Sequence, residues 1–296
     1  MAEITTFFER EFATNWEDLA QQRDSRLAPT VLRDSFKGAR KSYNQLATGS
    51  MTEITDRKGD TPDGDSTGTR YWIFRRKFEF VRVWDEDDEV QLAGIVLPTS
   101  DEIRSATMAE NRTKDDVIIS SFDATRYIGT NGTDTDAFDT NFSIAVDYVY
   151  SGSAANSGLT IPKLREAARI LNEAECPSEN RFIAYGAQQL DDMLATVEAT
   201  SRDYSDLMAL KDGKIDFFMG FKWIPTQRLA INTSTDIRTN FVWQMEGVKF
   251  ADLERNVHID TRPDKRHAQQ LRCVKRMGAV RTLNTSVVRI YCDESP

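Results

Sequence analysis

Residues able to do acid–base chemistry are few in this chain. A hydrolytic triad needs a histidine as its general base, and the 296 residues include only His258 and His267. His258 lies in the strand-like stretch VHID, and His267 lies in a basic stretch with a helical pattern. We expect structural or exposed roles for both, and the sequence contains no glycine-rich phosphate loop. The sequence therefore predicts no catalytic residue.

Carboxylates gather at two places where a metal ion could be imagined. The first is a run of five acids, Asp85, Glu86, Asp87, Asp88 and Glu89. Consecutive side chains alternate across a strand or fan around a helix, so they do not converge on one ion. The second is Asp134, Asp136 and Asp139, which resemble the start of a calcium loop but lack its glycine and its final glutamate. We expect no metal and no cofactor, and we interpret the acidic run as a solvated or intersubunit charge patch.

A basic cluster in the last forty or so residues could bind phosphates. Its members are Arg262, Lys265, Arg266, Arg272, Lys275, Arg276 and Arg281. As a DNA-binding patch, the cluster would give affinity without reading sequence. Alternatively, it is a solvated face, or it meets acidic groups such as residues 85–89 on another subunit. No aromatic residue interleaves these positions to stack on bases, which favours the second interpretation.

The composition predicts a substantial core in one large domain or two closely joined domains, because 40% of the residues are apolar and 10% are aromatic. The formal charge of −9 argues against a freely soluble nucleic-acid binder. Cys176, Cys273 and Cys292 share no metal-binding or redox spacing and follow no signal peptide, so we expect reduced, mostly buried thiols. The apolar runs are far shorter than the roughly 18 residues of a membrane-spanning helix, so no membrane insertion is expected.

The most β-prone stretch is RYWIFRRKFEFVRVW, residues 70–84. Aromatic and basic residues share both of its faces, so we expect that it can bury neither face cleanly within its own chain. The predicted contacts with adjacent copies are Arg70, Tyr71, Trp72, Phe74, Arg75, Arg76 and Lys77, together with the acidic run at 85–89. We expect the aromatic side chains of residues 70–84 to supply most of the buried area and the charges to set orientation.

Helical patterns occur at several places. An aromatic stripe formed by Phe7, Phe8, Phe12, Trp16 and Leu19 predicts a short helix, which either packs on its own domain or lies across a neighbouring subunit. Further helices are predicted over 115–124, over 160–175 before Pro177, over about 190–197, and from Ser201 to near Gly213.

Loops and strands separate these helices. Residues 49–69 and 128–141 have loop composition. The alternation of KIDFFMGFKWIP predicts one extended strand with Ile215, Phe217, Met219, Phe221 and Trp223 on a single face. Strands dominate up to residue 260 or so, and Val287 to Cys292 closes the chain as another alternating strand. The interleaving of helices and strands predicts an α+β protein.

The C-terminal half carries a family resemblance. RFIAYGAQQLDDML, TSRDYSDLMALKDGKIDFFMGFKWIPTQRL, RPDKRHA and RMGAVRTLNTSVVRIYC follow one another in that order. In order and spacing they resemble the major capsid proteins of tailed bacteriophages, which have the capsid fold named after a Hong Kong phage. The detailed match covers residues 155–296, and the N-terminal half agrees only in its plan.

The resemblance implies a division of the chain into parts. These are an N-terminal arm (1–47), an extended loop formed as a β-hairpin (48–95), a peripheral domain with a long spine helix (96–200), an axial domain (201–275) and a return strand of the peripheral domain (276–296). Residues 160–175 would be the spine helix.

The resemblance also implies a function. The chain would assemble into pentamers and hexamers of an icosahedral virion shell around double-stranded DNA, contacted without sequence preference. It would be made and assembled in the bacterial host cytoplasm and would not be an enzyme. Partners would be other copies of the chain, a separate scaffolding protein, a portal and a decoration protein.

Some family members crosslink their subunits through a lysine–asparagine bond. Lys58 lies on the expected loop, but no matching asparagine signature is found, so non-covalent assembly is expected. Two other functions are left open by the residues. One is a decoration or tail component, and the other is a metal-dependent cytosolic enzyme whose carboxylates would have to converge in a pocket.

Overall fold

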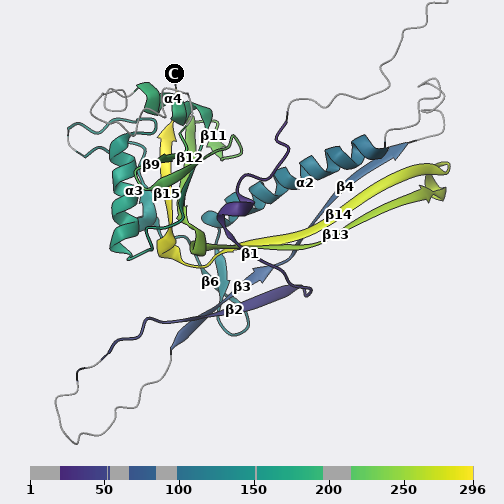
Figure 1. Cartoon of the computed structure of the whole chain (residues 1–296), viewed down its shortest axis with the longest axis horizontal. Coiled ribbons are helices and arrows are strands. Elements are labelled where there is room, and N and C mark those ends of the chain that lie inside the picture. The colour runs from purple at the N-terminus through teal and green to yellow at the C-terminus, as the bar shows by residue number, and fades with distance from the viewer. Residues whose placement is uncertain are drawn as a thin grey trace, which may run out of the picture. The chain divides into compact units, whose positions relative to one another are not determined.

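A computed structural model describes residues 21–51, 53, 67–84, 99–150, 152–195 and 215–295. The chain folds into two compact units (Figure 1). The first unit is formed by Met1–Asp24, Lys77–Thr113 and Glu254–Lys275, and the second by Ser25–Arg76, Lys114–Leu253 and Arg276–Pro296. Several helices and three sheets fill the described ranges, which confirms the α+β class.

The largest sheet belongs to the second unit and has the order β7-β15-β12-β8-β10-β9, with β11 paired to β12. Its strands are β7 (Ser143–Ile144), β8 (Arg181–Tyr185), β9 (Phe217–Phe218), β10 (Phe221–Pro225), β11 (Ile231–Asn232), β12 (Ile237–Gln244) and β15 (Val287–Asp293). The central strand β8 is buried at every position, as expected for a strand covered on both faces. β15 alternates buried and partly buried residues from Val288 on, as the sequence predicted.

Two helices in the second unit, α3 (Ile161–Glu173) and α4 (Ala187–Ala195), contribute to the core of this sheet. Leu164, Ala167 and Leu171 recur on one face of α3 and are fully buried. Pro162 stands in the first turn, where a missing N–H costs nothing, and Glu175 leaves the helix with a φ of 53°. The helix predicted over 160–175 is confirmed.

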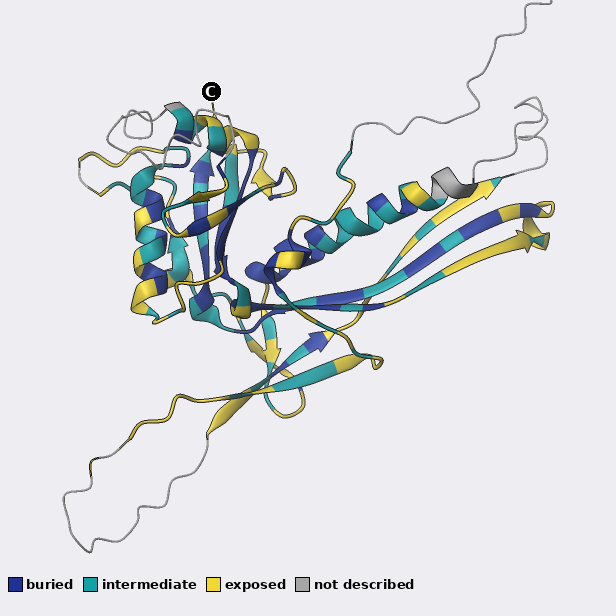
Figure 2. Ribbon diagram, viewed as in Figure 1, coloured by how far each residue is buried: buried dark blue, intermediate teal, exposed yellow. Residues whose placement is uncertain are grey.

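A smaller sheet of the second unit has the order β2-β3-β5-β6. Its strands are β2 (Arg40–Leu46), β3 (Gly68–Phe74), β5 (Arg126–Ile128) and β6 (Asp134–Asp136). β2 and β3 form an antiparallel ladder from Arg40 opposite Phe74 to Leu46 opposite Gly68. One face of the ladder is buried, because Tyr71 and Ile73 pack with Ala251, Leu253 and Val280 (Figure 2).

The third sheet contains two long strands and has the order β1-β13-β14-β4. Its members are β1 (Leu32–Asp34), β4 (Arg76–Trp84), β13 (Val248–Arg262) and β14 (Ala268–Arg281). In the first unit, the helix α2 (Thr99–Phe122) packs on β14 and β4 through Ala106, Leu271 and Cys273, with Ile103, Phe80 and Trp84 beside them. α2 includes the helix predicted over 115–124 and is longer than α3.

Three local predictions were wrong. Residues 128–141 are not all loop, because Asp134–Asp136 form the strand β6. Residues 215–223 do not form one strand, because Met219 and Gly220 have φ values of 52° and 83° and turn the chain between β9 and β10. Consecutive positive φ angles give the tight turn that suits a two-residue hairpin. Phe217 is consequently 61% exposed, whereas Phe221 is fully buried. His267 lies in no helix, because Arg266 and His267 have φ values of 51° and 60° and form the turn before β14.

Some predictions fall outside the described residues. These are the aromatic stripe at 7–19, most of the loop at 49–69 including Lys58, the acidic run at 85–89, Val197, and the helix from Ser201 to Gly213. The three cysteines are free thiols, with Cys273 and Cys292 buried and Cys176 partly buried, as the sequence predicted.

Candidate intersubunit surfaces

The β2–β3 hairpin carries four of the twelve predicted contact residues, Arg70, Tyr71, Trp72 and Phe74, and several of them are held within the hairpin sheet. The Nε of Arg70 donates to Oδ1 of Asn44 at 2.8 Å. The indole Nε1 of Trp72 donates to the carbonyl oxygen of Gly129 at 2.8 Å, and the guanidinium of Arg40 lies 4.7 Å from the centre of the Trp72 ring. Trp72 therefore has its polar group satisfied and one ring face covered within its own chain.

Tyr71 does not fit the predicted role. Its side chain is only 6% exposed, and its ring stacks on Tyr43 at a centroid distance of 5.4 Å. The expectation that residues 70–84 can bury neither face at home was wrong for β3, because the long strands β13 and β14 supply Ala251, Leu253 and Val280 as apolar partners. A single sequence window does not show these partners, which lie about 180 to 210 residues away.

Phe74 and its neighbours lie on an exposed part of the surface. Phe74 is 38% exposed and meets Tyr127, itself 43% exposed, edge to face at 4.9 Å. Arg75 is exposed where β3 gives way to β4, and the guanidinium of Arg76 donates to Oγ of Ser120 at 3.3 Å. Lys77 is exposed in the first unit. An apolar pair beside an exposed arginine is a surface that a partner chain could cover.

A polar cluster supports the base of this hairpin. The Lys41 ammonium lies 2.8 Å from a carboxylate oxygen of Asp34, the Tyr43 hydroxyl donates to the same carboxylate, and Lys249 lies 4.0 Å from the centre of the Tyr43 ring. Burial opposes ionisation of Asp34, but the hydrogen bonds from Lys41 and Tyr43 outweigh it and lower the pKa of Asp34 to about 2. Burial and the bond to Asp34 together raise the pKa of Tyr43. The cluster is stable as an ionised carboxylate with its donors protonated.

The predicted basic cluster is dispersed by the fold. In the first unit, Arg262 chelates the carboxylate of Asp264, Arg272 pairs with Glu79 at 2.9 Å, and Lys275 pairs with Glu110 at 3.3 Å. Lys265 and Arg266 lie exposed on the turn between β13 and β14, and no acidic partner for them is found in the described part of the chain. The turn is therefore the portion of the cluster that is available to a phosphate or to another subunit.

Arg281 does not belong to any basic surface, which corrects the prediction. Its side chain is fully buried, and its guanidinium donates to the carbonyl oxygens of Phe122 and Ala124 at 2.6 and 3.1 Å. A cation at these positions satisfies carbonyls at the C-terminal end of α2. Burial lowers the pKa of Arg281 to about 10, and the positive charge of Arg126 adds to the effect. Arg276, also in the second unit, is only partly exposed.

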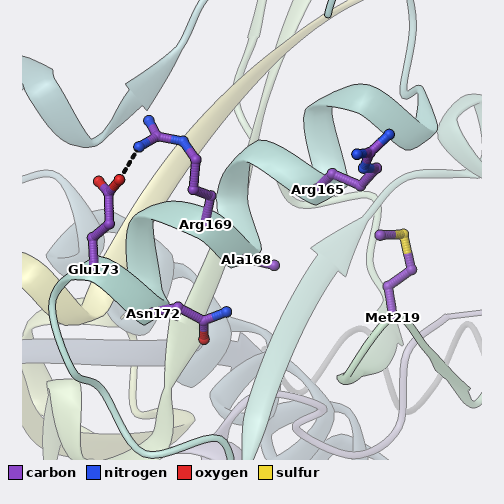
Figure 3. Close-up of a pocket in the computed structure, with 6 residues that line it drawn as sticks. All are labelled: Arg165, Ala168, Arg169, Asn172, Glu173 and Met219. Carbon is purple, nitrogen blue, oxygen red and sulfur yellow. Dashed lines mark hydrogen bonds and ion pairs between the residues drawn. The ribbon is translucent and has the colours of Figure 1, made fainter.

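A groove of about 500 Å³ lies along the outer face of α3 (Figure 3). It is lined by Arg165, Ala168, Arg169, Asn172 and Glu173 of the helix and by Met219 of the β9–β10 turn. The Arg169 guanidinium already pairs with Glu166 and Glu173. The groove is open, and the carboxylate of Glu173 in its wall is paired with Arg169, so the lining residues offer no unpaired nucleophile or general base.

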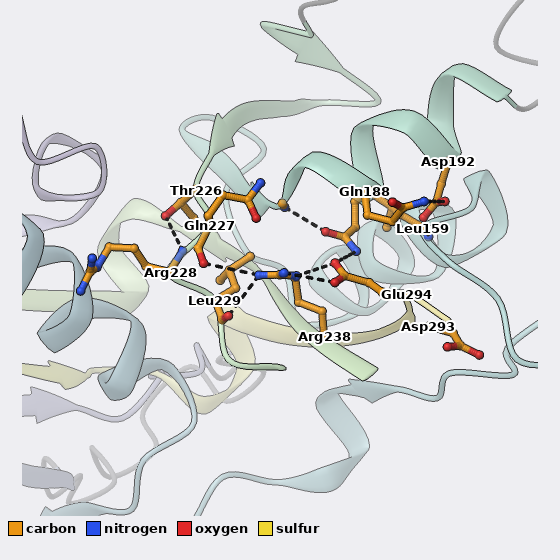
Figure 4. Close-up of polar contacts among 12 residues, drawn as sticks. Leu159, Gln188, Asp192, Thr226, Gln227, Arg228, Leu229, Arg238, Asp293 and Glu294 are labelled. Carbon is orange, nitrogen blue, oxygen red and sulfur yellow. Dashed lines mark hydrogen bonds and ion pairs between the residues drawn. The ribbon is translucent and has the colours of Figure 1, made fainter. Parts of the chain in front are cut away.

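A largely buried ion pair holds the end of the last strand (Figure 4). Nε of Arg238 lies 2.5 Å from Oε1 of Glu294, and the two side chains are 11% and 12% exposed. Gln189 of α4 donates to the same carboxylate at 2.8 Å. Burial opposes the ionisation of Glu294, but the bonds from Arg238 and Gln189 still lower its pKa. These contacts join α4, β12 and the end of β15 and stabilise this part of the second unit.

Asp115 was not singled out from the sequence. It is fully buried and accepts hydrogen bonds from Oγ of Ser25 at 2.6 Å and from the backbone N–H groups of Arg26 and Leu27 at 3.1 Å each. The carboxylate thereby fixes Ser25, Arg26 and Leu27 at the start of the second unit. No local signal marks this role, because its donors lie 88 to 90 positions earlier in the sequence.

Within the described ranges, no group of three or more histidine, cysteine or acidic side chains could hold a metal ion. No helix in the same ranges is long and apolar enough to cross a membrane. Asp134 and Asp136 lie on β6, where Asp136 pairs with Arg126 at 2.6 Å, and Asp139 caps a short turn through the N–H of Asn141. The carboxylates of Asp136 and Asp139 thus have partners of their own among the described residues.

Comparison with known proteins gives the family. The family model described as phage capsid protein matches residues 4–294. A solved chain of Mycobacterium phage Che8 is 16% identical, with a TM-score of 0.69, and the match covers 96% of this chain and 97% of that one. The capsid structure of cyanophage P-SCSP1u is 12% identical, with a TM-score of 0.73 and coverage of 100% and 96%.

The capsid of Ralstonia phage GP4 is also similar, at 8% identity, with a TM-score of 0.67 and coverage of 98% of this chain and 97% of that one. No curated protein matches the chain. At such low identities the solved structures show the fold only, and membership of the family is shown by the family model. The chain belongs to the phage capsid protein family, has the capsid fold that the resemblance implied, and is confirmed as a relative of phage major capsid proteins.

Proposed function

We propose that this chain is the repeating subunit of an icosahedral shell, built from pentamers and hexamers, that encloses phage double-stranded DNA. The observation that carries this proposal is the match of the capsid family model to residues 4–294, together with capsid structures that cover nearly the whole chain. The role is structural, and we infer no catalytic step.

Assembly would proceed through many copies of one heterologous contact, in which a patch of one subunit meets a different patch of the next and closes a ring. On the second unit, Phe74, Tyr127 and the 75% exposed Leu46 offer apolar area, and Arg75 offers charge. Burial contributes roughly 25 cal/mol per Å² of apolar surface, and exposed ion pairs contribute about 0 to 1 kcal/mol each. Weak single contacts allow wrongly placed subunits to leave, and we expect association to be sensitive to salt.

We propose a modified division of the chain. The expected boundaries place the spine helix at 160–175, but α2 has 24 residues and α3 has 13. We therefore assign α2 as the spine helix, and β2 and β3 as the two strands of the extended loop. The sheet that carries α3, α4 and β15 would then belong to the axial domain, which extends that domain beyond the expected 201–275.

The partners follow from the same role. Other copies of the chain come first, and a scaffolding protein, a portal and a decoration protein would complete the particle in the host cytoplasm. Lys265 and Arg266 would face either packaged DNA, through contacts that read no sequence, or acidic groups of another subunit. We propose that the subunits are not covalently linked, and a ladder of multimers from mature particles on denaturing electrophoresis would show the opposite.

The proposal is tested by electron microscopy of the full chain, expressed alone and with the scaffolding protein from the same phage. Rings of five or six, tubes or closed shells are expected. Small monodisperse particles under every condition would overturn the proposal and favour an accessory virion protein. A melting temperature raised by a metal ion, with no assembly, would favour an enzyme.

A matched pair of variants locates the contact surface. Phe74→Asp places a charge on the hairpin sheet at a side chain that is 38% exposed, and Ile231→Asp does so on β11 at a side chain that is 39% exposed. We expect Phe74→Asp to abolish shells and Ile231→Asp to leave them, with both proteins folded by circular dichroism. If the two variants form shells equally well, Phe74 does not lie in the contact between subunits.

A further inference from the structure

The outer half of β13 is an open sheet edge. In the first unit, Glu254–Arg262 of β13 lies beside β14, which continues to β4 on the other side. β1 pairs with β13 only at Lys249, Phe250 and Ala251, all in the second unit. Among the described residues, no strand pairs with the free edge from Glu254 to Arg262. Such an edge presents unpaired N–H and C=O groups and is a template for another strand.

Two large apolar side chains lie exposed on this otherwise polar edge. Val257 is 42% exposed and Ile259 is 53% exposed. Both share the face of the strand that carries Arg255, which pairs with Glu110 of α2 at 3.4 Å. The opposite face carries Glu254, Asn256, His258, Asp260 and Arg262. Charged side chains, bulges and prolines protect open edges against other strands. The stretch from Glu254 to Arg262 contains no proline, and its charges are of both signs, so a second copy can meet them with opposite charges.

We propose that the outer half of β13 pairs antiparallel with the same segment of a second copy of this chain, with His258 of one copy opposite His258 of the other. This inference rests on the proposed self-assembly and deepens it. In this register Glu254 faces Arg262 of the second copy, and Val257 faces Ile259. Opposite charges and apolar side chains directly across an antiparallel ladder stabilise the pairing.

Other registers either bring like charges together or set apolar side chains against polar ones; the shift that pairs Arg255 with Asp260, for example, leaves Val257 opposite His258. A shift that places Val257 opposite Val257 sets Glu254 against Asp260, which brings two acids together. A shift that sets Arg255 opposite Arg262 brings two cations together. The register centred on His258 avoids every pair of like permanent charges and repeats its Glu254–Arg262 pair at both ends.

The symmetry of the contact is that of a closed dimer. The same nine residues meet on both sides, so the contact is isologous about a two-fold axis. Opposite residues of an antiparallel pair share a face, so this axis is perpendicular to the sheet, and the helix α2 of each copy lies on the same side of the joined sheet. A curved shell, whose subunits must all present the same side to its interior, is compatible with this arrangement.

Cysteine substitution tests the register. His258→Cys would bring two identical sulfurs together, because opposite Cα atoms in an antiparallel pair are about 4.5 or 5.5 Å apart and a disulfide requires about 4.4 to 6.8 Å. Successive pairs of an antiparallel ladder alternate between hydrogen-bonded and non-hydrogen-bonded pairs. A mixture of the Val257→Cys and Ile259→Cys variants therefore tests the kind of pair that His258→Cys does not. After mild oxidation of the assembled full-length protein, we expect His258→Cys dimers and Val257→Cys with Ile259→Cys heterodimers on non-reducing gels.

The controls are Asn256→Cys alone and Asp260→Cys alone, which face different residues in this register and should stay monomeric. Asn256 lies opposite Asp260 in this register, so disulfide-linked dimers in a mixture of the two variants would support the register at a further pair. Absence of crosslinks both from His258→Cys and from the Val257→Cys and Ile259→Cys mixture would overturn the proposal. Equal crosslinking at all positions would overturn it as well, because it would show that the copies collide at random and do not pair in one register.

Charge reversal supplies a test without cysteines. Glu254→Arg should weaken the association of two copies about 2- to 10-fold, since it replaces two exposed ion pairs with repulsion. Adding Arg262→Glu to the same chain restores opposite charges and should restore the affinity, although Arg262 also loses Asp264 within its own chain. Failure of the double variant to recover, with both variants folded, would contradict the pairing.

The outcome separates this inference from the proposed function. Shells that form normally without any crosslink at His258→Cys would refute the strand pairing and leave the shell-forming role intact. Crosslinked dimers in register from a protein that never forms shells would support the pairing and refute that role.

Discussion

Replacement of Asp115 by alanine should be among the most damaging single changes to this chain. The carboxylate is fully buried and accepts three hydrogen bonds, from Ser25 Oγ and from the N–H groups of Arg26 and Leu27. A hydrogen bond to a charged group contributes about 1.5 to 3 kcal/mol, and a buried donor left unpaired carries a further penalty. Because the three bonds act as a unit, we expect a loss of about 4 kcal/mol rather than their sum.

The assay is thermal or urea unfolding of the unassembled chain. About 4 kcal/mol corresponds to a fall in Tm of roughly 8 to 16 °C for a protein of this size. Asp116→Ala is the matched control, because Asp116 is the next residue, is 44% exposed and pairs with Arg228 at the surface. That change should cost less than about 1 kcal/mol. If the two variants differ by less than about 1 kcal/mol, the reasoning on the buried carboxylate is refuted.

Three further predictions follow from particular contacts. The folded pKa of Asp34, about 2, lies below the ordinary value of 3.8 for an aspartate, so its stabilisation of about 2 kcal/mol is present above pH 4 and is lost as the pH falls toward 2. Asp34→Asn should therefore flatten acid unfolding in that window. Gly220→Ala should cost about 1 to 2 kcal/mol, because Gly220 has a φ of 83°, whereas Gly49→Ala, which no atom crowds, should change the unfolding free energy little. Reversal of both Lys265 and Arg266 to glutamate should leave the monomer folded; loss of DNA packaging with intact shells would assign the turn to DNA, and loss of shells would assign it to a subunit contact.

The choice of Lys265 and Arg266 depends on the structure. From sequence alone, Arg272, Lys275 and Arg276 are equally attractive positions for a charge reversal. Arg272 and Lys275 bind Glu79 and Glu110 within the first unit, so their reversal would disturb folding as well as any contact with DNA. A failure to package DNA would then carry no information about the surface.

Elements with a clear local pattern could be predicted from the sequence. α3 follows from a stripe of apolar residues bounded by prolines, and β15 follows from alternation. The β9–β10 turn was missed because the apolar alternation continues through Met219 and Gly220, and only the backbone angles reveal the reversal. α2 was recognised only at its C-terminal end, where Val117, Ile118 and Phe122 are buried, because its first turns are rich in charged and polar residues.

The candidate surfaces were predicted less well, for a physical reason. Whether a residue such as Tyr71 or Arg281 lies on a surface depends on strands that arrive from distant parts of the sequence. Tyr71 is buried by β13 and β14, and Arg281 is buried at the end of α2. A local reading of charge and aromatic content identifies residues able to make contacts, but the partner of each contact is set by the topology.

A cryo-electron microscopy reconstruction of particles containing this chain is the decisive test of its shell-forming role. We expect the fold described above to repeat in five-fold and six-fold rings over a closed shell, with no other protein forming the continuous wall. Finding the chain only at one vertex, in a tail, or attached outside a wall made by another protein would contradict it.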